Sequence, residues 1–167
     1  MNFQRKGARS NTHVGKDFEE KIQSYFQNQG VELTPNVSVS IGINKKRKQH
    51  KFDLGNISKG IIVECKSHTW TESGNVPSAK MTTWDQAMYY FHACPPGYMK
   101  IFIALKDYSF KRKETLCDYY LRTKDHLIPE DVEIWEFDQS KLVADKKNQI
   151  ANKAFHLTAK TSAALTR

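Results

Sequence analysis

The chain reads Phe52-Asp53-Leu54-Gly55 and, a few residues later, Ile61-Ile62-Val63-Glu64-Cys65-Lys66. The second segment is rich in Ile and Val, which favours a β-strand, yet it carries an acid and a base two positions apart. Side chains at positions i and i+2 of a strand point to the same face. We therefore expect Glu64 and Lys66 to project side by side, with the residues that alternate with them on the opposite face.

A second acid, Asp53, is expected next to this pair. Residues 50–56 are predicted to form a short strand that turns at 55–60, which puts Asp53 and Glu64 on neighbouring strands. Two carboxylates beside an ammonium form an oxygen-rich site that suits Mg²⁺. The apolar run 61–63 predicts a strand covered on both faces, where carboxylates are costly to bury unless a cation neutralises them. The alternative is a solvated Glu–Lys pair on an edge strand, worth less than about 1 kcal/mol.

The order Asp53, Glu64, Lys66 resembles the signature of the PD-(D/E)xK nuclease superfamily, an acid followed by acid-x-Lys on the next strand. Phe52 stands where that signature nominally has Pro. The resemblance implies a restriction-endonuclease-like α/β fold, with an αβββαβ core and a mixed central sheet flanked by helices. It also implies phosphodiester hydrolysis that leaves a 5′-phosphate. In that chemistry Asp53, Glu64 and the backbone carbonyl of Cys65 hold Mg²⁺ (or Mn²⁺), and Lys66 orients the attacking water or stabilises charge on phosphorus.

Two predicted helices add candidate residues. Helical spacing of apolar residues predicts a helix over 14–29, and Glu19 lies at the edge of its apolar stripe. Members of the superfamily commonly place a Glu of this helix near the metal, which makes Glu19 a candidate catalytic residue; the alternative is a solvated acid favoured by the helix dipole. A second helix, 78–93, carries Gln86 and Tyr90 four positions apart on one side. This pair resembles the QxxxY element of several nuclease branches, which implies that Gln86 helps to position the site and that Tyr90 contacts the DNA strand.

A dense positive segment, 44–51, lies between two predicted strands and leads directly into the strand of Asp53. We expect it to overhang the acidic residues and to hold nucleic-acid phosphates there. A solvated hairpin tip is the alternative. The candidate nucleic-acid-binding residues of the segment are Lys45, Lys46, Arg47, Lys48 and Lys51.

The overall charge supports a polyanionic partner. The formal net charge is +8 and the pI is about 9.3, a balance that raises encounter rates with nucleic acid. No apolar run reaches membrane-spanning length and the N-terminus has no apolar signal core, so we expect a cytoplasmic protein without a membrane partner. Three widely spaced cysteines indicate reduced thiols, and the six histidines show no ligand spacing for a transition metal.

The chain divides into three predicted parts: a basic flexible arm over 1–13, a nuclease domain over 14–138 and a basic C-terminal extension over 139–167. Within the domain, further strands are predicted over 31–43, 99–105 and 132–137, and a further helix over 114–127. The pattern leaves the role of the extension open between a partly helical tail, a dimerisation element and a DNA contact.

We therefore predict a Mg²⁺-dependent DNA endonuclease of restriction, homing, mobile-element or phage type. One such domain has a single strand-cutting site, which favours a homodimer or higher oligomer, or a subunit of a larger nuclease. Two alternatives are kept: a non-catalytic nucleic-acid-binding module that retains the nuclease fold, and an RNA-directed nuclease or binder, since basic loops with aromatics also suit single strands.

Overall fold

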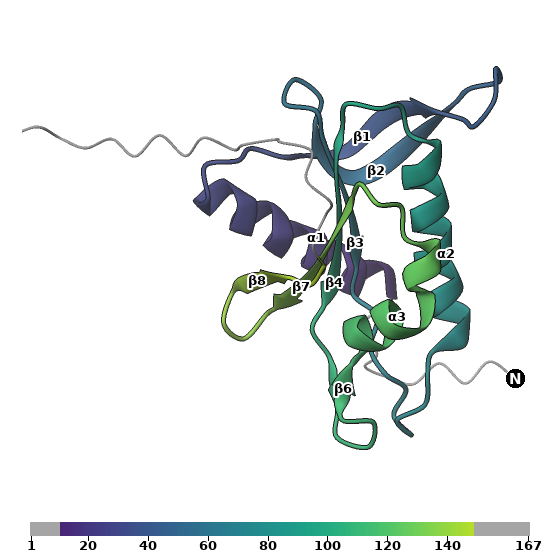
Figure 1. The fold of residues 1–167 in the computed structure, drawn as a ribbon. Coiled ribbons are helices and arrows are strands. Elements are labelled where there is room, and N and C mark those ends of the chain that lie inside the picture. The colour runs from purple at the N-terminus through teal and green to yellow at the C-terminus, as the bar shows by residue number, and fades with distance from the viewer. Residues whose placement is uncertain (1–10, 149–167) are drawn as a thin grey trace, which may run out of the picture.

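The computed structural model describes residues 11–148, which form an α/β fold (Figure 1). In chain order the first elements are α1 (Asn11–Asn28), β1 (Thr34–Ile41), β2 (Lys48–Asn56), β3 (Ile61–Lys66), α2 (Ser78–Ala93) and β4 (Met99–Leu105). They are followed by β5 (Tyr108–Ser109), β6 (Glu114–Thr115), α3 (Leu116–Lys124), a 3₁₀ turn (Asp125–Leu127), β7 (Val132–Asp138) and β8 (Val143–Lys146). The first six elements have the predicted order of helix, three strands, helix and strand.

Six of the strands form one mixed sheet in the order β1-β2-β3-β4-β7-β8. The three central strands, β3, β4 and β7, run parallel, and the outer pairings are antiparallel. Parallel neighbours need a crossover connection, and here α2 joins β3 to β4 while α3 joins β4 to β7. The short strands β5 and β6 pair with each other in a separate ribbon.

Helices cover both faces of the sheet, with α1 on one side and α2 and α3 on the other (Figure 1). The stripe of α1 predicted from helical spacing is buried against one face at Phe18, Ile22 and Phe26. Trp84 and Phe91 of α2 are buried against the other face. The central strand β3 is buried from its first residue through Cys65, as its continuous apolar sequence predicted.

The structure confirms the strand over 99–105 and the helix over 78–93, and it changes the start of the two other predicted helices. The first helix begins at Asn11, and it is followed by Gly30 with a φ of 77°, a conformation that favours glycine. The predicted helix over 114–127 begins with a two-residue strand instead. Thr115 then caps α3, because its hydroxyl accepts a hydrogen bond from the backbone N–H of Asp118 (3.1 Å).

The sheet continues beyond residue 138, where the sequence analysis ended the nuclease domain. β8 pairs with β7 in register from Asp138–Val143 to Trp135–Lys146, so the first residues of the predicted extension belong to the sheet. The predicted arm up to residue 10, and the extension from 149 to 167, lie outside the described residues. No helix among residues 11–148 combines the length and apolar character that a membrane-spanning segment requires.

Candidate active site

Asp53 and the Glu64/Lys66 pair come together where the regular pairing of two strands ends. β2 and β3 are paired in register from Asn56–Ile61 to Leu54–Val63. Immediately beyond, the backbone N–H of Cys65 donates to Oδ2 of Asp53 at 2.7 Å, so a side chain takes the place of a backbone acceptor. The two strands thereby hold the Asp53 carboxylate against the peptide that joins Glu64 to Cys65.

The strand β2 departs from simple alternation at Asp53. Phe52 packs in the cluster on the α2 side of the sheet, stacked on Phe91, whereas Leu54 packs in the cluster on the α1 side. Residues two apart in a regular strand face the same way, so β2 twists between these positions. Asp53 is located at this irregularity, which turns its carboxylate toward β3.

Glu64 is the buried member of the site, with 5% of its surface exposed. Its Oε2 accepts a hydrogen bond from Lys66 Nζ at 2.9 Å, and its Oε1 lies 3.4 Å from His50 Nε2. Burial alone would raise the pKa of Glu64, but the His50 hydrogen bond and the Lys66 ammonium outweigh it and lower that pKa. Burial would likewise lower the pKa of Lys66, and the negative charges of Glu64 and Asp53 raise it. Glu64 and Lys66 are therefore a charged pair.

Asp53 is the carboxyl group with the weakest compensation. Burial and the adjacent Glu64 charge raise its pKa to about 7, against the opposing effects of Lys66 and the Cys65 N–H. Glu19 projects from α1 toward the same group of charges: burial and the charge of Glu64 raise its pKa as well. The site thus holds more carboxylates than its one ammonium neutralises, and an additional cation would favour the ionised form of Asp53.

The donor set of this site fits a hard divalent cation. It consists of the Asp53 and Glu64 carboxylates and the carbonyl of Cys65, all oxygen. In a strand the N–H and C=O of one residue are directed to the same neighbour, so the Cys65 carbonyl lies on the edge that faces Asp53. The Cys65 thiol is excluded as a ligand, because it is buried in the α1-side cluster and burial raises its pKa well above the usual value. Within residues 11–148, no three His, Cys, Asp or Glu side chains converge in a metal-ligating group.

His50 belongs to the site and was not predicted from the sequence. Besides its contact with Glu64, its ring lies 3.9 Å from the ring of Tyr90, measured between centroids, and packs edge-on against Phe52. Tyr90, predicted as a DNA contact, is thereby connected to Glu64 through His50. Gln86, its predicted partner, lies one turn earlier on α2 and is exposed.

His68 is a second histidine close to the site, beyond the end of β3. Its Nδ1 accepts a hydrogen bond from the Trp84 indole at 2.9 Å. Burial lowers the pKa of His68 to about 4, and the Lys66 charge acts in the same direction. A neutral imidazole therefore fixes the segment after β3 to α2.

Another buried acid, Glu136, lies on the same row of the sheet as Lys66, since Lys66 pairs with Ala104 and Ala104 with Glu136. Its Oε2 lies 3.7 Å from Lys147 Nζ, which also contacts Asp118 of α3 at 2.7 Å. Glu136 is thus part of the packing between β7 and α3, two strands away from Glu64.

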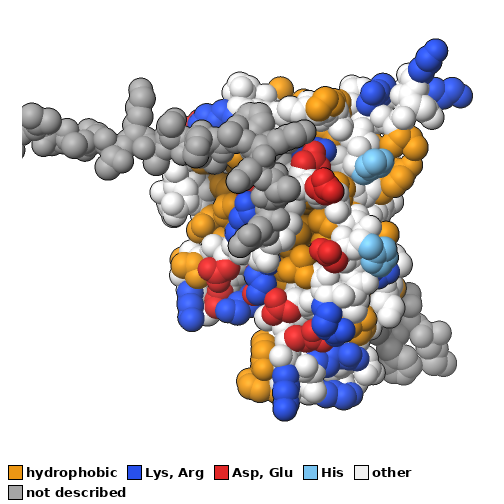
Figure 2. Space-filling model, viewed as in Figure 1, with side chains coloured by type: hydrophobic (Ala, Val, Ile, Leu, Met, Phe, Trp, Pro, Cys, Tyr) orange, Lys and Arg blue, Asp and Glu red, His pale blue; other side chains and the backbone are white. Residues whose placement is uncertain are grey.

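The predicted basic segment is the hairpin between β1 and β2, and Lys and Arg side chains gather at its tip (Figure 2, upper right). Lys45, Lys46, Arg47 and Lys48 are exposed, and within residues 11–148 no acid forms an ion pair with them. Lys51 is also exposed, further along β2. A groove of about 290 Å³ separates the hairpin from α2.

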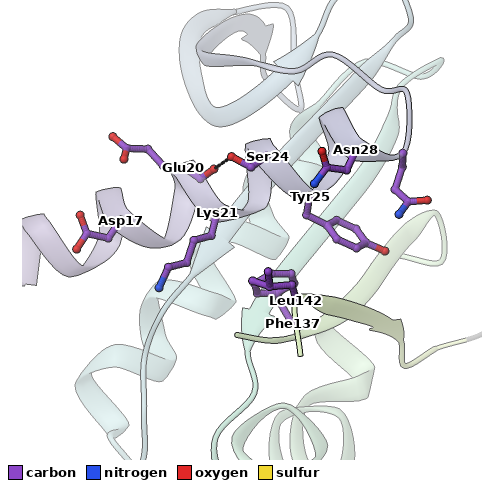
Figure 3. A pocket seen from close by; sticks show the side chains of 9 residues that line it. Asp17, Glu20, Lys21, Ser24, Tyr25, Asn28, Phe137 and Leu142 are labelled. Atoms are coloured by element: carbon purple, nitrogen blue, oxygen red, sulfur yellow. Dashed lines mark hydrogen bonds between the residues drawn. The ribbon is translucent and has the colours of Figure 1, made fainter. Parts of the chain in front are cut away.

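A larger hollow, of about 570 Å³, lies between α1 and the β7–β8 hairpin. Figure 3 shows Tyr25, Phe137 and Leu142 at its centre, whereas Asp17 and Glu20 point away from them. None of the predicted site residues lines it. This hollow is therefore separate from the candidate active site.

Comparison of the chain with protein-family models, with curated proteins and with solved structures finds no match.

Proposed function

We propose that the protein is a Mg²⁺-dependent DNA endonuclease with a restriction-endonuclease-like core formed by α1, β1, β2, β3, α2 and β4. The observation that carries the proposal is the meeting of the buried Glu64 carboxylate, the partly exposed Asp53 carboxylate, the Lys66 amine and the Cys65 backbone: Cys65 N–H to Asp53 at 2.7 Å and Lys66 Nζ to Glu64 at 2.9 Å. The proposal derives further support from the element order and from the exposed cations on the neighbouring hairpin.

Asp53, Glu64 and the Cys65 carbonyl would hold the ion, and Mn²⁺ would be an acceptable substitute for Mg²⁺. When bound, the ion would supply Lewis-acid chemistry: it would polarise the scissile phosphate and make a nearby water more acidic. Lys66 orients the attacking water and stabilises negative charge that develops on the phosphoryl oxygens. Water adds to phosphorus as the bond to the 3′ oxygen breaks, which leaves a 5′-phosphate and a 3′-hydroxyl.

The other residues have supporting roles in this proposal. His50 and Lys66 fix the rotamer of Glu64, and Glu19 adds negative charge at the α1 side of the site. Gln86 assists placement of the strand from α2. The basic hairpin binds phosphates beside the reacting one, and Tyr90 contacts the strand. Two copies, or a partner subunit, supply the second cut of a double-strand break.

The direct test is incubation of supercoiled plasmid with the purified full chain in Mg²⁺ and, separately, in chelator. We expect nicked or linear DNA only with Mg²⁺ or Mn²⁺, and ends that a ligase joins without added kinase. Parallel reactions with single-stranded DNA and RNA identify the preferred substrate. Intact plasmid in Mg²⁺ together with retained DNA binding would identify a non-catalytic binding module instead.

A further inference from the structure

The groove between the β1–β2 hairpin and α2 combines apolar walls with a cationic rim. Ile43 of the hairpin and Tyr89 of α2 line it and expose 62% and 56% of their surfaces. Lys46, Arg47 and Lys48 line the same groove. Packing in the core does not explain why these large apolar side chains are exposed next to a cluster of cations. Together, the apolar walls and the cations provide a surface for a ligand that is both planar and anionic.

The groove is a built feature, because the hairpin is fixed to the helix. The backbone N–H of Gly42 donates to the carbonyl of Ala93 at 2.9 Å. A Cβ at Gly42 would overlap the carbonyl oxygen of Lys46 and approach Arg47 Cδ to 3.2 Å, so glycine permits the tight return of the hairpin. The backbone that carries the cations is therefore held at a defined position beside α2.

The groove adjoins the candidate active site through two packed side chains. Tyr90 lines the groove and also packs on His50, whose Nε2 lies 3.4 Å from Glu64. A strand whose phosphate lies at Asp53 and Glu64 consequently has a neighbouring nucleotide within reach of the groove.

We propose that this groove binds an unpaired DNA nucleotide adjacent to the scissile phosphate, an inference that rests on the proposed nuclease function for the position of that phosphate. The base stacks on Tyr89 between the apolar walls, and Lys46, Arg47 and Lys48 bind the flanking phosphates. A base inside a duplex has both faces covered by its neighbours, whereas an unpaired base offers a free face to an aromatic ring. The unpaired base requires a single strand or a duplex with unpaired nucleotides at a junction or end, and the choice of DNA follows from the proposed nuclease function.

The test measures binding without cutting. Full-chain Asp53→Asn protein in chelator is titrated into fluorescently labelled oligothymidylate, the same oligonucleotide with an abasic site at each position in turn, a duplex of equal length and an RNA of equal length. We expect the single strand to bind more tightly than the duplex. Adding Tyr89→Ala should weaken single-strand binding about tenfold or more and change duplex binding little. Tyr89→Phe should retain binding, because the ring remains.

Tyr108→Ala is the matched control, since Tyr108 is a similarly exposed aromatic (48%) on the separate β5–β6 ribbon. An equal effect of Tyr89→Ala on single strand and duplex, no effect of it, or an equal effect of Tyr108→Ala would overturn the groove assignment. Tighter binding of RNA than of DNA would overturn the choice of DNA.

The two proposals fail separately. Plasmid cutting by the wild-type chain, combined with unchanged single-strand binding in Tyr89→Ala, rejects the groove and retains the nuclease. Tyr89-dependent binding of single strands, combined with no cutting of any substrate in Mg²⁺, retains the groove as a binding site and rejects the nuclease.

Discussion

Asp53 and Glu64 share one ammonium at the point where β2 and β3 separate, and the two acids differ in their surroundings. Glu64 has Lys66 and His50 as partners, which lower its pKa, whereas Asp53 has a backbone N–H and a pKa raised to about 7. A carboxyl group with a raised pKa is destabilising when it is ionised. The chain therefore maintains an unfavourable charge at the position where the proposed metal binds, a feature common among functional sites.

Asp53→Asn should stabilise the protein in chelator, and more at high pH. The folded pKa of about 7 exceeds the ordinary value of 3.8, so wild-type stability falls as the pH rises from about 4 through 7, and asparagine avoids this loss. Asparagine also keeps an oxygen that can accept the Cys65 N–H. We expect the free energy of unfolding to increase by about 2 kcal/mol at pH 8, and the increase to vanish near pH 4. This is less than the full pKa shift of Asp53 implies, because Asp53 is partly exposed. Thermal unfolding at several pH values measures it, and a variant less stable than wild type at pH 8 would contradict it.

Mg²⁺ should make the wild-type chain more stable than Asp53→Asn. A ligand that binds only the folded state stabilises it by about 2.7 kcal/mol at one hundred times its dissociation constant. Saturating Mg²⁺ at pH 8 should therefore raise the unfolding temperature of the wild-type chain, and Asp53→Asn should respond much less. Equal shifts in both proteins would show that the ion binds elsewhere.

Lys66→Ala should reduce cutting by at least about a hundredfold while the protein remains folded, because the proposal assigns Lys66 to charge stabilisation in the reaction. Cleavage rates and near-ultraviolet circular dichroism together check this. Lys106→Ala removes a partly exposed lysine just beyond β4 and is the matched control. Cleavage that persists at the wild-type rate in Lys66→Ala would remove this residue from the site.

The sequence was sufficient to predict that Glu64 and Lys66 lie together, because strand periodicity determines it. It was not sufficient for His50, whose role depends on a contact between β2, β3 and α2. A lone histidine has no spacing signal that marks it as a site residue. The one available signal was its position two residues before Phe52, which places both side chains on the face buried against α2.

At the scale of elements, the β1–β2 hairpin carries the unpaired positive charge of the site region. Each phosphate contact contributes about 0.7–0.9 to the slope of log affinity against log salt. Replacing Lys46, Arg47 and Lys48 by Ala together should lower that slope by about 2–3 and weaken binding of all DNA sequences alike. Lys59→Ala, in the exposed turn between β2 and β3, is the control. An unchanged slope in the triple variant would show that the hairpin is only solvated.

The last strand of the sheet is extended by a side chain. Asn148 accepts from the backbone N–H of Ile134 and donates to the carbonyl of Val132, both at 2.8 Å, and so continues the pairing of β8 along β7. Asn148→Ala leaves both backbone groups without this partner and should cost about 1–2 kcal/mol of unfolding free energy. Urea denaturation measures this loss of stability. Asn148→Asp keeps only the hydrogen-bond acceptor, so its stability should lie between those of the wild-type chain and Asn148→Ala. A loss below experimental error in Asn148→Ala would show that β8 is held without this residue.

Elements with a clear period were predicted closely, and short or polar ones were not. The apolar strand over 99–105 and the amphipathic helix over 78–93 have the predicted bounds. β6 has only two residues, too few for a period, and it replaced the start of a predicted helix. β8 is polar and mostly exposed, and its pairing with β7 has no local signal in its sequence.

For the whole molecule, the site depends on a sheet order that the sequence pattern did not specify. The parallel arrangement of β3, β4 and β7 buries Glu64 in the middle of the sheet, and the antiparallel β2 brings Asp53 to its side. Helices cover both faces of the sheet, and the basic hairpin beside the site remains exposed. This combination of buried charge and an exposed basic hairpin supports the proposed metal-dependent phosphodiesterase activity.

The most direct measurement is the rate of plasmid nicking in saturating Mg²⁺ by the wild-type chain and by Glu64→Gln, which preserves the size and packing of the buried side chain. We expect the wild-type chain to nick the plasmid only without chelator, and the rate to fall at least about a hundredfold in Glu64→Gln. Equal nicking by both proteins, or nicking that chelator does not affect, would contradict the claim that Asp53, Glu64 and Lys66 form a metal-dependent catalytic site.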